Sequence, residues 1–595
     1  MDSRLEVGRW TAVLVVSVVL GCASDPEPSA TVLTESTDLR SAPDTAAGAE
    51  HLVPPPKVEP LEVLTSKNDN GRTGTNRGEE QLSVANVRGL VLRATLPVDG
   101  ELYAQPLVAG EVDTPSGRKT LVVAATMNDS VFAFDLDAPD GSAPVWHVGK
   151  SGELGTPGQS TRNVFGPNGI LSTPVISGAR ERVYVVARDC NPDVKVTVGS
   201  CANVQSTATC RVRLFALALG TGAVVAETVI AGAGFEPAVQ WNRPGLLLEG
   251  DGLFVAFGSG PNGNQHEEDF VYHGYLFRYD AADLTKPPAM FNTTPTTRGG
   301  SVWQAGTAPA SDGKWVYFTA ANRTLDCKTH PPGDFPPKPT DFEDSVLRLP
   351  LDFATETAPS QVLGYADTRP YTAAGFTGTV FQFTNAGDVG FGSSGPALIP
   401  GTEDLLVSSK GGLLYVLDRH TLTPRHPPLS PFSTLPLQGD HALYVHSWSG
   451  IPVVYGALAI SRPRLADGLP APYALAYGWA QDELLRAFRY DDETHALTLH
   501  ATAAVPAMPG GGFMSVSTND GKPGSTLVWA TTRTVTGAAG QGHLWAFDGE
   551  TLETLWETDT PAFSKFTPPT VVRGRVLVAS ALTGGAMAVL VYSLP

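Results

Sequence analysis

The sequence lacks any extended stretch in which apolar residues recur every 3.6 positions, so it does not predict long amphipathic helices. It also lacks Gly-x-Ser-x-Gly, His-Glu-x-x-His and EF-hand motifs, which leaves the common serine hydrolase, zinc protease and calcium-sensor classes without support. Charged residues make up only 17% of the chain, and no dense run of Lys or Arg is present. Because acidic residues outnumber basic ones by 60 to 41, a net charge of −19, nucleic acid is disfavoured as a partner.

The first residues have the pattern of an export signal. Arg4 and Arg9 precede an apolar run over residues 10–20, which is too short to span a bilayer but suits a signal-peptide core. The run ends in Val19-Leu-Gly-Cys22, which resembles a bacterial lipobox and implies cleavage before Cys22 and acylation of that residue. An ordinary secretory signal with an incidental cysteine is the alternative.

Residues 22–60 are rich in Ser, Thr, Ala, Pro and acidic residues and poor in aromatic ones. Such a composition cannot bury enough apolar surface to fold, so we expect a flexible tether between the signal peptide (1–21) and a folded body (61–595). The residue after Cys22 is Ala23 rather than Asp, which by resemblance to a bacterial sorting rule favours the outer membrane. We therefore expect a lipid-anchored protein of the bacterial cell envelope, facing the periplasm or the cell surface, with no membrane contact beyond the anchor.

Cysteine is scarce, with five residues in 595. If Cys22 carries lipid, an even number remains, which in an exported protein predicts two disulfides. Three of the four lie within one segment, so we expect one local bond and a second bond that joins the third cysteine to the distant one; the four are Cys190, Cys201, Cys210 and Cys327. A zinc site is the alternative, but no Cys-x-x-Cys pair or nearby His supports it.

One strand-like motif recurs eight times. Its copies are spaced roughly 45 to 85 residues apart, and we interpret them as the last strand of eight similar sheets. The copies are Val131-Phe-Ala-Phe-Asp135, Leu214-Phe-Ala-Leu217, Leu276-Phe-Arg-Tyr-Asp280, Val346-Leu-Arg-Leu349, Leu414-Tyr-Val-Leu-Asp418, Leu485-Arg-Ala-Phe-Arg-Tyr490, Leu544-Trp-Ala-Phe-Asp548 and Leu590-Val-Tyr-Ser-Leu594. A single such sheet cannot bury both of its faces, so the sequence predicts a closed, all-β, eight-bladed propeller.

Each unit begins at a Pro- or Gly-marked inner strand, as at Ala104-Gln-Pro106 and Thr567-Pro-Pro569. Trp146 and Trp556 follow the repeated motif in their units, where a large ring would fill the gap between neighbouring blades. Residues 90–97 form a strand-like segment before the first unit, and the last unit is short at its C-terminal end. We expect the two to pair and close the ring.

Several stretches resemble the bacterial pyrroloquinoline-quinone-like propellers, which are similar to quinoprotein alcohol dehydrogenases and to BamB-type outer-membrane assembly lipoproteins. The resemblance runs from about Leu64 to Pro595 and rests on segments such as Asn68-Asp-Asn-Gly-Arg-Thr-Gly74, Val302-Trp-Gln-Ala-Gly306 and Lys565-Phe-Thr-Pro-Pro-Thr570. In true quinoproteins the family pattern implies a tryptophan floor, adjacent cysteines over the quinone, and calcium held by Glu, Asn and Asp. Trp303 could be the floor by position, but no two cysteines here are adjacent and the calcium ligands cannot be mapped.

Two groups of residues are candidate sites. Residues at the start of inner strands could face an axial channel and bind a ligand there; these are Trp303, Gln304, His446 and Trp448. One loop gathers hard oxygen and imidazole ligands that could hold a metal, namely His266, Glu267, Glu268, Asp269 and His273. The simpler interpretations are structural lining for the first group and an acidic surface loop for the second.

Three functions follow as hypotheses. The preferred one is a non-catalytic propeller lipoprotein, a monomeric ring that binds a protein or glycan at the cell envelope, with no cofactor. The second is an oxidoreductase that uses pyrroloquinoline quinone and calcium in the axial channel around Trp303 and His446. The third is a polysaccharide lyase or hydrolase, which would need a cleft with two carboxylates about 5 to 10 Å apart.

Overall fold

The computed structural model describes residues 62–158, 166–191, 210–259, 272–296, 299–321, 340–342, 344–355, 357–359, 391–410, 412–426, 454–505, 510–534, 540–582 and 586–595. It also describes the backbone of residues 361–363, 370–373 and 376–379. Cys22 and the expected signal peptide and tether lie outside these residues. Among the described residues, helix is limited to two 3-10 turns, η1 (Val87–Gly89) and η3 (Phe391–Ser393), and none is long and apolar enough to cross a membrane.

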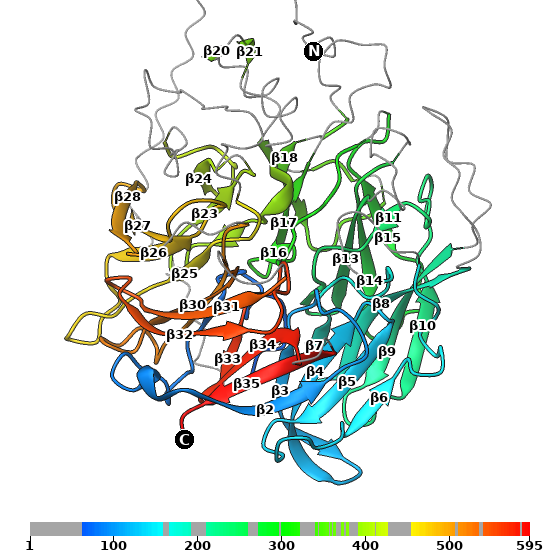
Figure 1. The fold of residues 1–595 in the computed structure, drawn as a ribbon. Coiled ribbons are helices and arrows are strands. Elements are labelled where there is room, and N and C mark those ends of the chain that lie inside the picture. The colour runs from blue at the N-terminus through cyan, green and yellow to red at the C-terminus, as the bar shows by residue number, and fades with distance from the viewer. Residues whose placement is uncertain are drawn as a thin grey trace, which may run out of the picture. The chain divides into compact units, whose positions relative to one another are not determined.

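Apart from β20 and β21, the described strands form eight sheets that follow one another in chain order as the blades of a propeller (Figure 1). The first four blades are β3–β6 (Leu107–Thr114, Gly117–Thr126, Ser130–Asp135, Trp146–Val148), β7–β10 (Val175–Ser177, Arg182–Cys190, Cys210–Ala218, Val224–Val229), β11–β15 (Gln240–Trp241, Leu247–Glu249, Gly252–Ser259, Tyr275–Asp280, Ala289–Asn292) and β16–β19 (Ala310–Ser311, Trp315–Ala320, Ser345–Pro350, Gln361–Leu363). In blade 3 both short strands, β11 and β12, pair with β13.

Blades 5 to 8 follow in chain order. They are β22–β24 (Ala397–Leu398, Asp404–Ser408, Leu414–Asp418), β25–β28 (Ala459–Ser461, Tyr473–Gly478, Arg486–Asp491, Leu497–Thr502), β29–β32 (Phe513–Ser517, Leu527–Arg533, Gly542–Asp548, Thr554–Thr560) and β33–β35 (Thr570–Val572, Arg575–Ala581, Met587–Ser593) with β2 (Val91–Pro97). A separate ladder joins β20 (Pro370–Ala373) to β21 (Phe376–Thr379). The eight-bladed prediction is confirmed.

The repeated motif lies on β5, β9, β14, β18, β24, β27, β31 and β35, which corrects one expectation. In seven of the eight blades this strand is the third in the sheet, and an outer strand follows it; only in blade 5 is it the last described strand. Several outer strands, such as β10 and β28, are mostly exposed and bury few apolar side chains.

The ring closes as predicted by pairing the two ends of the folded body. β2 runs antiparallel to β35, with Thr95 opposite Leu590 and Val91 opposite Ser593. Blade 8 therefore takes three strands from the C-terminus and one from residues 91–97. This arrangement gives the last blade its outer strand and leaves no gap in the circle.

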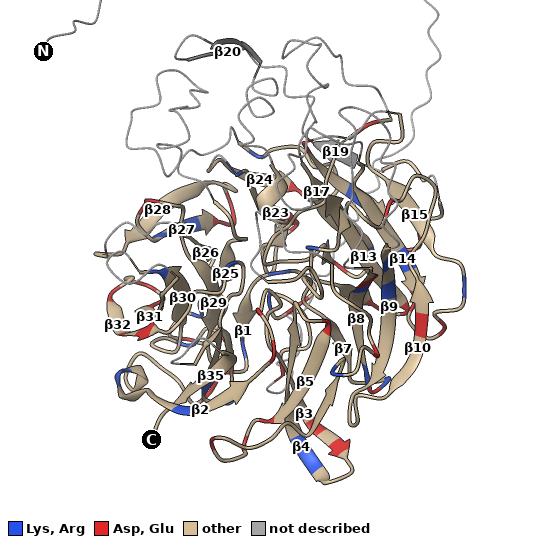
Figure 2. Cartoon of the chain, turned by 45° about the vertical axis from the view of Figure 1, so that its right-hand side comes forward, with Lys and Arg blue, Asp and Glu red and all other residues tan. Residues whose placement is uncertain are grey.

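The apolar core lies mainly between blades rather than within them. Separate clusters of buried side chains join each blade to the next, for example Val255 and Tyr184 between blades 2 and 3, and Tyr477 and Phe547 between blades 6 and 7. Trp146 and Trp556, which we predicted to fill the gaps between neighbouring blades, lie at such interfaces. The Trp146 indole donates a hydrogen bond to the Leu219 carbonyl of blade 2, and Trp556 of blade 7 meets Tyr592 of blade 8 edge to face. Charged residues of both signs are interspersed over outer strands and turns (Figure 2).

Residues 62–79, here called the axial segment, contact the inner strand of every blade in order. The hydrogen bonds join Val63 to Val108, Leu64 to Ile176, Asn70 to Leu248 and Ser311, Gly71 to Leu398, Thr73 to Ile460, Gly74 to Val516, and Asn76 to Val571. Its strand β1 (Thr75–Asn76) runs parallel to β29 (Figure 2). This segment therefore follows the inside of the ring from blade 1 to blade 8.

Two buried cations hold the axial segment in place. Arg72 is fully buried and donates to the Pro309 carbonyl of blade 4 and to Thr65 and Ser66 of its own segment, each at 2.8 Å. Lys67 Nζ donates to the Met514 carbonyl at 2.8 Å, and burial lowers the pKa of this amine to about 7. Because buried charges require partners, these contacts explain how a polar segment lies inside the ring.

Candidate functional site

A cluster of aromatic side chains lies around the axis of the ring. Its buried members are Tyr103, Met127, Leu171, Trp241, Trp303, Ala305, Ala321, Phe513 and Phe566, with Tyr455 and Phe563 partly buried against them. We call this set the axial cluster. β29 begins at Phe513, in the cluster, and ends at Ser517, opposite Asn76 of the axial segment. Lys67 of the axial segment donates to the carbonyl of Met514, the residue after Phe513, so the axial segment and the axial cluster adjoin.

Several members of the axial cluster come from the few residues that precede the inner strand of a blade, which we call its lead-in. Trp241 and Trp303 meet edge to face, with ring centroids 6.2 Å apart. Phe566 packs against Phe513 at 5.4 Å and against Tyr103 at 6.4 Å. The Pro- and Gly-marked lead-ins predicted from the sequence thus bring aromatic rings from different blades into one group.

The lead-ins of blades 4 and 8 meet at Gly306 and Phe566. A Cβ added to Gly306 would collide with the Phe566 carbonyl, and Gly306 has a φ of +74°. Phe566 itself has a φ of +70°, a left-handed conformation that is uncommon for a bulky residue. Only glycine fits at position 306, so this contact fixes Trp303 and Phe566 relative to one another.

Two cations lie over these rings. The Arg243 guanidinium carbon is 4.1 Å from the Phe566 ring centroid and 5.2 Å from that of Trp303. The Lys565 Nζ is 4.7 Å from the Phe566 centroid and 4.9 Å from that of Tyr455. These distances are within the range of cation–π attraction.

The pKa of Lys565 lies far below its ordinary value. Burial lowers its pKa to about 7, and the positive charges of Arg243, Lys410 and Arg533 lower it further in the same direction. In the described part of the chain Lys565 pairs with no Asp or Glu carboxylate. The four cations come from blades 3, 5, 7 and 8.

The structure places two of the predicted channel residues. Trp303 lies in the axial cluster with 8% of its surface exposed. Gln304 is fully buried; its amide donates to the Ala308 carbonyl at 3.0 Å and accepts a bond from the Thr319 N–H at 3.5 Å, so it braces the lead-in of blade 4. His446 and Trp448 lie outside the described residues.

Of the predicted metal ligands, only His273 is described; His266, Glu267, Glu268 and Asp269 are not. The Nδ1 atom of His273 lies 2.9 Å from the Thr294 carbonyl oxygen, and burial lowers the pKa of His273. Within the described ranges no group of three His, Cys, Asp or Glu side chains is positioned to hold a metal ion.

The local disulfide is confirmed as a bond between Cys190 and Cys210. It joins the end of β8 to the start of β9, where the two residues are register partners. Cys201 and Cys327, which we expect to form the second bond, are not among the described residues.

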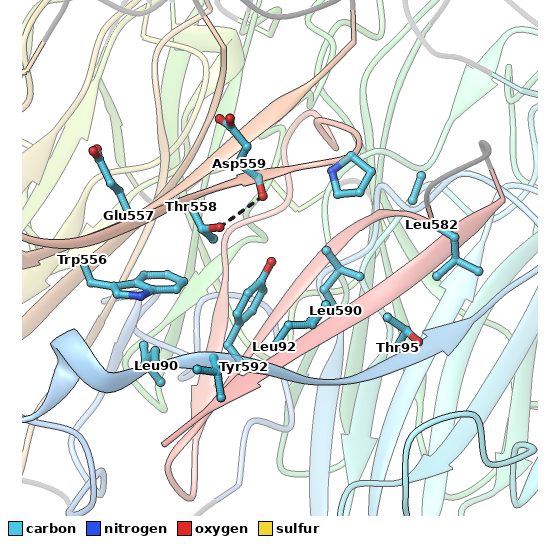
Figure 3. Close-up of a pocket in the computed structure, with 13 residues that line it drawn as sticks. Leu90, Leu92, Thr95, Trp556, Glu557, Thr558, Asp559, Leu582, Leu590 and Tyr592 are labelled. Atoms are coloured by element: carbon cyan, nitrogen blue, oxygen red, sulfur yellow. Dashed lines mark hydrogen bonds between the residues drawn. The ribbon is translucent and has the colours of Figure 1, made fainter. Parts of the chain in front are cut away.

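A separate pocket of about 480 Å³ lies beside the ring closure (Figure 3). Its walls come from β32, β35 and β2 and include Trp556, Tyr592, Leu590 and Leu92. The carboxylates of Glu557 and Asp559 point away from it in Figure 3 and lie 3.5 and 2.7 Å from the ring nitrogens of His543. Its lining is mainly apolar and includes no Lys or Arg side chain, so this pocket has fewer groups that could bind a charged ligand than the axial end has.

Sequence reasoning missed the four cations. Arg533 ends β30, whereas Arg243, Lys410 and Lys565 lie in loops, and the four are remote in sequence from one another. One signal was available for two of them: Arg243 and Lys565 each come shortly before a lead-in proline, Pro244 and Pro568. A search for charged residues in these lead-ins would have found that pair.

No protein-family model matches this sequence, and no curated protein sequence matches it. Solved structures do match. They include a quinohemoprotein alcohol dehydrogenase from Pseudomonas putida (TM-score 0.54, 16% identity) and one from Comamonas testosteroni (0.55, 14%), each aligned over 90% of this chain and 80% of its own. A europium-containing methanol dehydrogenase aligns over 90% of this chain and 98% of its own (0.56, 13%). At such low identity the likeness shows the propeller fold alone, which the quinoprotein dehydrogenases share.

Proposed function

We propose that this chain is a non-catalytic binding propeller of the bacterial cell envelope, anchored by lipid at Cys22, whose axial end takes a carboxylate-bearing ligand. The ligand would be an acidic glycan or an acidic protein segment. The observation that carries the proposal is the position of Lys565, which lies over two aromatic rings among three other cations. A bound anion would relieve the repulsion among these groups, while the rings would contact the apolar part of the ligand.

Binding suits this site better than acid–base catalysis. A glycosidase mechanism needs two carboxyl groups on either side of the scissile bond. Among the described residues, the charged groups that shift the pKa of Lys565 are all cations, namely Arg243, Lys410 and Arg533. Such a set can hold and orient an anion, and it supplies no general base at neutral pH other than the Lys565 amine itself.

A quinone-dependent oxidoreductase is the second candidate, favoured by the shared fold. The cations and rings would suit the carboxylates and flat body of pyrroloquinoline quinone. The described residues do not suit its calcium, because the neighbourhood of Lys565 carries four positive charges and would repel a divalent cation. No two cysteines are adjacent in the sequence to cover a quinone. We derive no reaction step through this cofactor.

Titration of the full-length protein in detergent tests the proposal. We expect polygalacturonate or poly-glutamate to bind, with an affinity that falls as salt rises, while neutral dextran does not bind. Lys565→Gln should weaken binding by about tenfold, the loss of one charged contact. Lys522→Gln changes an exposed lysine of a turn and serves as the matched control. Equal binding of dextran and polygalacturonate, or binding of neither acidic polymer, would overturn the proposal.

Two further measurements separate the alternatives. Incubation with pyrroloquinoline quinone and calcium, followed by removal of free quinone, should leave no calcium-dependent absorption on the protein; a retained chromophore with alcohol-oxidising activity favours the second candidate. Cys22→Ser should move the protein from the membrane fraction to the soluble fraction in a bacterial host. Retention in the membrane fraction contradicts the lipid anchor.

A further inference from the structure

Two hydrogen-bond donors line the pocket beside the ring closure, and neither has an acceptor. They are the Trp556 indole N–H and the Tyr592 hydroxyl, whose rings meet edge to face with centroids 5.5 Å apart (Figure 3). Neither group hydrogen-bonds to another residue within the described part of the chain. Burial raises the pKa of Tyr592 to about 12, so its hydroxyl keeps its proton at neutral pH. Other indoles do have acceptors, namely those of Trp146, Trp479, Trp529 and Trp545.

The rest of the pocket wall is mainly apolar and continues onto the surface of blade 8. Val91 and Leu92 of β2 line the pocket and are 43% and 49% exposed, so large aliphatic side chains face solvent beside it. The hydroxyls of its two threonines, Thr95 and Thr558, already donate within the chain. A well-matched occupant therefore offers apolar surface and hydrogen-bond acceptors and needs no charge.

A proline-rich segment meets these requirements. Proline has no backbone N–H, and a polyproline II helix makes no internal hydrogen bonds, so its carbonyls are free acceptors. Grooves lined by aromatic rings bind such segments. One such segment directly precedes the folded body of this chain. Residues 52–61 read Leu-Val-Pro-Pro-Pro-Lys-Val-Glu-Pro-Leu and lie outside the described residues.

The described chain begins next to blade 8, the blade that carries the pocket. Glu62, its first residue, accepts a hydrogen bond from the Gly110 N–H at 2.7 Å. The Glu62 carboxylate and the Arg573 guanidinium both lie within 3.2 Å of the place that a Cβ would take on Gly110. Because Arg573 is in the turn between β33 and β34, Glu62 lies beside this turn.

The distance from this turn to the pocket is short. Ser593 of β35 is the register partner of both Arg575 and Val91, so the turn and Val91 lie at the same end of blade 8. β33 and β2 are three strand spacings apart, which is about 15 Å. Residues 54–61 span about 25 Å as polyproline II, at about 3.1 Å per residue. The segment is therefore long enough to enter the pocket.

We propose that residues 53–56, Val-Pro-Pro-Pro, bind in this pocket as a polyproline II strap, with their side chains against Trp556 and Leu92 and their carbonyls accepting from Trp556 and Tyr592. The stretch expected to be a flexible tether is then fixed to the ring from residue 53 onward. Its free part starts at the outer edge of blades 7 and 8. The strap depends neither on the axial cluster nor on acylation of Cys22.

The covalent link favours this segment over the same chemistry from elsewhere. A segment tied to its site by a few residues meets it at an effective concentration on the order of millimolar. A small pocket with two donors gives only a weak contact, which such a concentration is enough to fill. A second copy of the chain, or a proline-rich segment of another protein, lacks this advantage.

Photo-cross-linking of the full-length protein tests the proposal. p-Benzoylphenylalanine replaces Lys57, which leaves residues 53–56 unchanged, and the cross-linked positions are found by mass spectrometry. We expect cross-links to residues 90–95 and 556–561. They should be about tenfold fewer when the probe replaces Val32, which lies further from the ring along the chain. Equal yields from the two positions would overturn the inference.

Leu92→Asp and Leu499→Asp form a matched pair. Leu92 is 49% exposed and Leu499 is 59% exposed, both on outer strands, but only Leu92 lines the pocket. Leu92→Asp should lower the yield from the probe at position 57 about tenfold, because it places a carboxylate against apolar groups. Leu499→Asp should leave the yield unchanged. Equal yields in the two variants would contradict the assigned site.

The prolines can be tested without altering the folded ring. The triple variant Pro54→Ala, Pro55→Ala, Pro56→Ala changes only the segment, and it should lower the yield about tenfold because the polyproline II conformation is no longer favoured. Tyr592→Phe keeps the ring and removes one donor, so it should lower the yield about fivefold. A yield that is unaffected by loss of the prolines would overturn the inference.

Two controls distinguish the possible occupants. In an equal mixture of unlabelled and ¹⁵N-labelled protein, cross-links should join residues of the same molecule; cross-links between light and heavy chains would make a second copy the occupant. A synthetic peptide of residues 51–61, added in excess, should compete with the strap and lower the yield. If this peptide binds the pocket while the probe at position 57 gives no cross-link there, the pocket takes such segments from another protein and the strap is ruled out.

Discussion

The Trp146 indole N–H donates a hydrogen bond to the Leu219 carbonyl at 2.9 Å and thereby joins blade 1 to blade 2. Gly222 lies directly against the Trp146 ring, where a Cβ would collide with it. The indole is thus enclosed by the turn that follows the repeated strand of the next blade. Each blade depends on its neighbour to cover apolar rings of this kind.

We expect Trp146→Phe to lower the free energy of unfolding by about 1–2 kcal/mol, because the ring stays and the hydrogen bond is lost. Trp146→Ala should cost about 3–5 kcal/mol, because it also leaves a cavity between the blades. Urea denaturation followed by fluorescence measures both. An alanine variant as stable as the unmodified protein would contradict the packing role.

The closure strand offers a matched pair of leucines. Leu96 is 5% exposed and Leu92 is 49% exposed, and both lie on β2. Leu96→Ala should therefore destabilise the protein by about 2–5 kcal/mol. Leu92→Ala should change stability by only about 0.5 kcal/mol. The midpoints of chemical denaturation give the comparison, and similar losses at the two positions would show that β2 does not pack as its burial pattern indicates.

The buried amine of Lys67 predicts a pH dependence of stability. Its pKa is about 7 in the folded protein and 10.5 in an unperturbed chain, so between these pH values the unfolded state binds a proton that the folded state does not. Stability should therefore rise with pH over this range. Lys67→Met removes the titrating group and should reduce the rise between pH 7 and pH 9, measured as the free energy of unfolding.

The Lys67→Met variant should also be less stable than the parent at pH 9, because it leaves the Met514 carbonyl without its donor. Lys522→Met, at an exposed turn, is the control and should preserve the pH dependence of the parent. If both variants show the full rise, Lys67 is not the source of the effect.

The disulfide between Cys190 and Cys210 closes a loop with a sequence separation of 20. Loop-closure entropy predicts that it stabilises the folded state by about 3 kcal/mol. The double variant Cys190→Ser, Cys210→Ser should show this loss when its free energy of unfolding is compared with that of the parent without reductant. Any further loss when reductant is added to the variant would report on a bond between Cys201 and Cys327.

Architecture was readable from the sequence because it depends on local patterns that repeat. The motif on β5, β14 and β31 marks a buried strand wherever it occurs, and the prolines before β3 and β33 mark where inner strands begin. The unpartnered strand at residues 91–97 could be assigned to the final blade because a propeller needs closure. The repeated motif was assigned to the last strand of each sheet because outer strands such as β10 and β28 share no common sequence that would mark them in every blade.

The candidate site could not be predicted from the sequence in the same way. Arg243, Lys410, Arg533 and Lys565 are brought together only by the circular order of the blades, and no local pattern records that proximity. The axial segment was hidden for a different reason. Lys67 and Arg72 are residue types usually found at the surface, so their burial follows from distant carbonyl partners rather than from their own identity.

The path of the axial segment has a consequence for biosynthesis. Residues 62–79 leave the ribosome before any blade does. The carbonyl that accepts from Lys67 lies 447 positions later in the chain, and the carbonyl that accepts from Asn76 lies 495 positions later. Contacts of such high sequence separation are formed slowly, since so much chain must first be ordered. The axial segment is therefore made before its partners and completed after them: a nascent chain that stops before blade 8 lacks the Val571 carbonyl to which Asn76 donates.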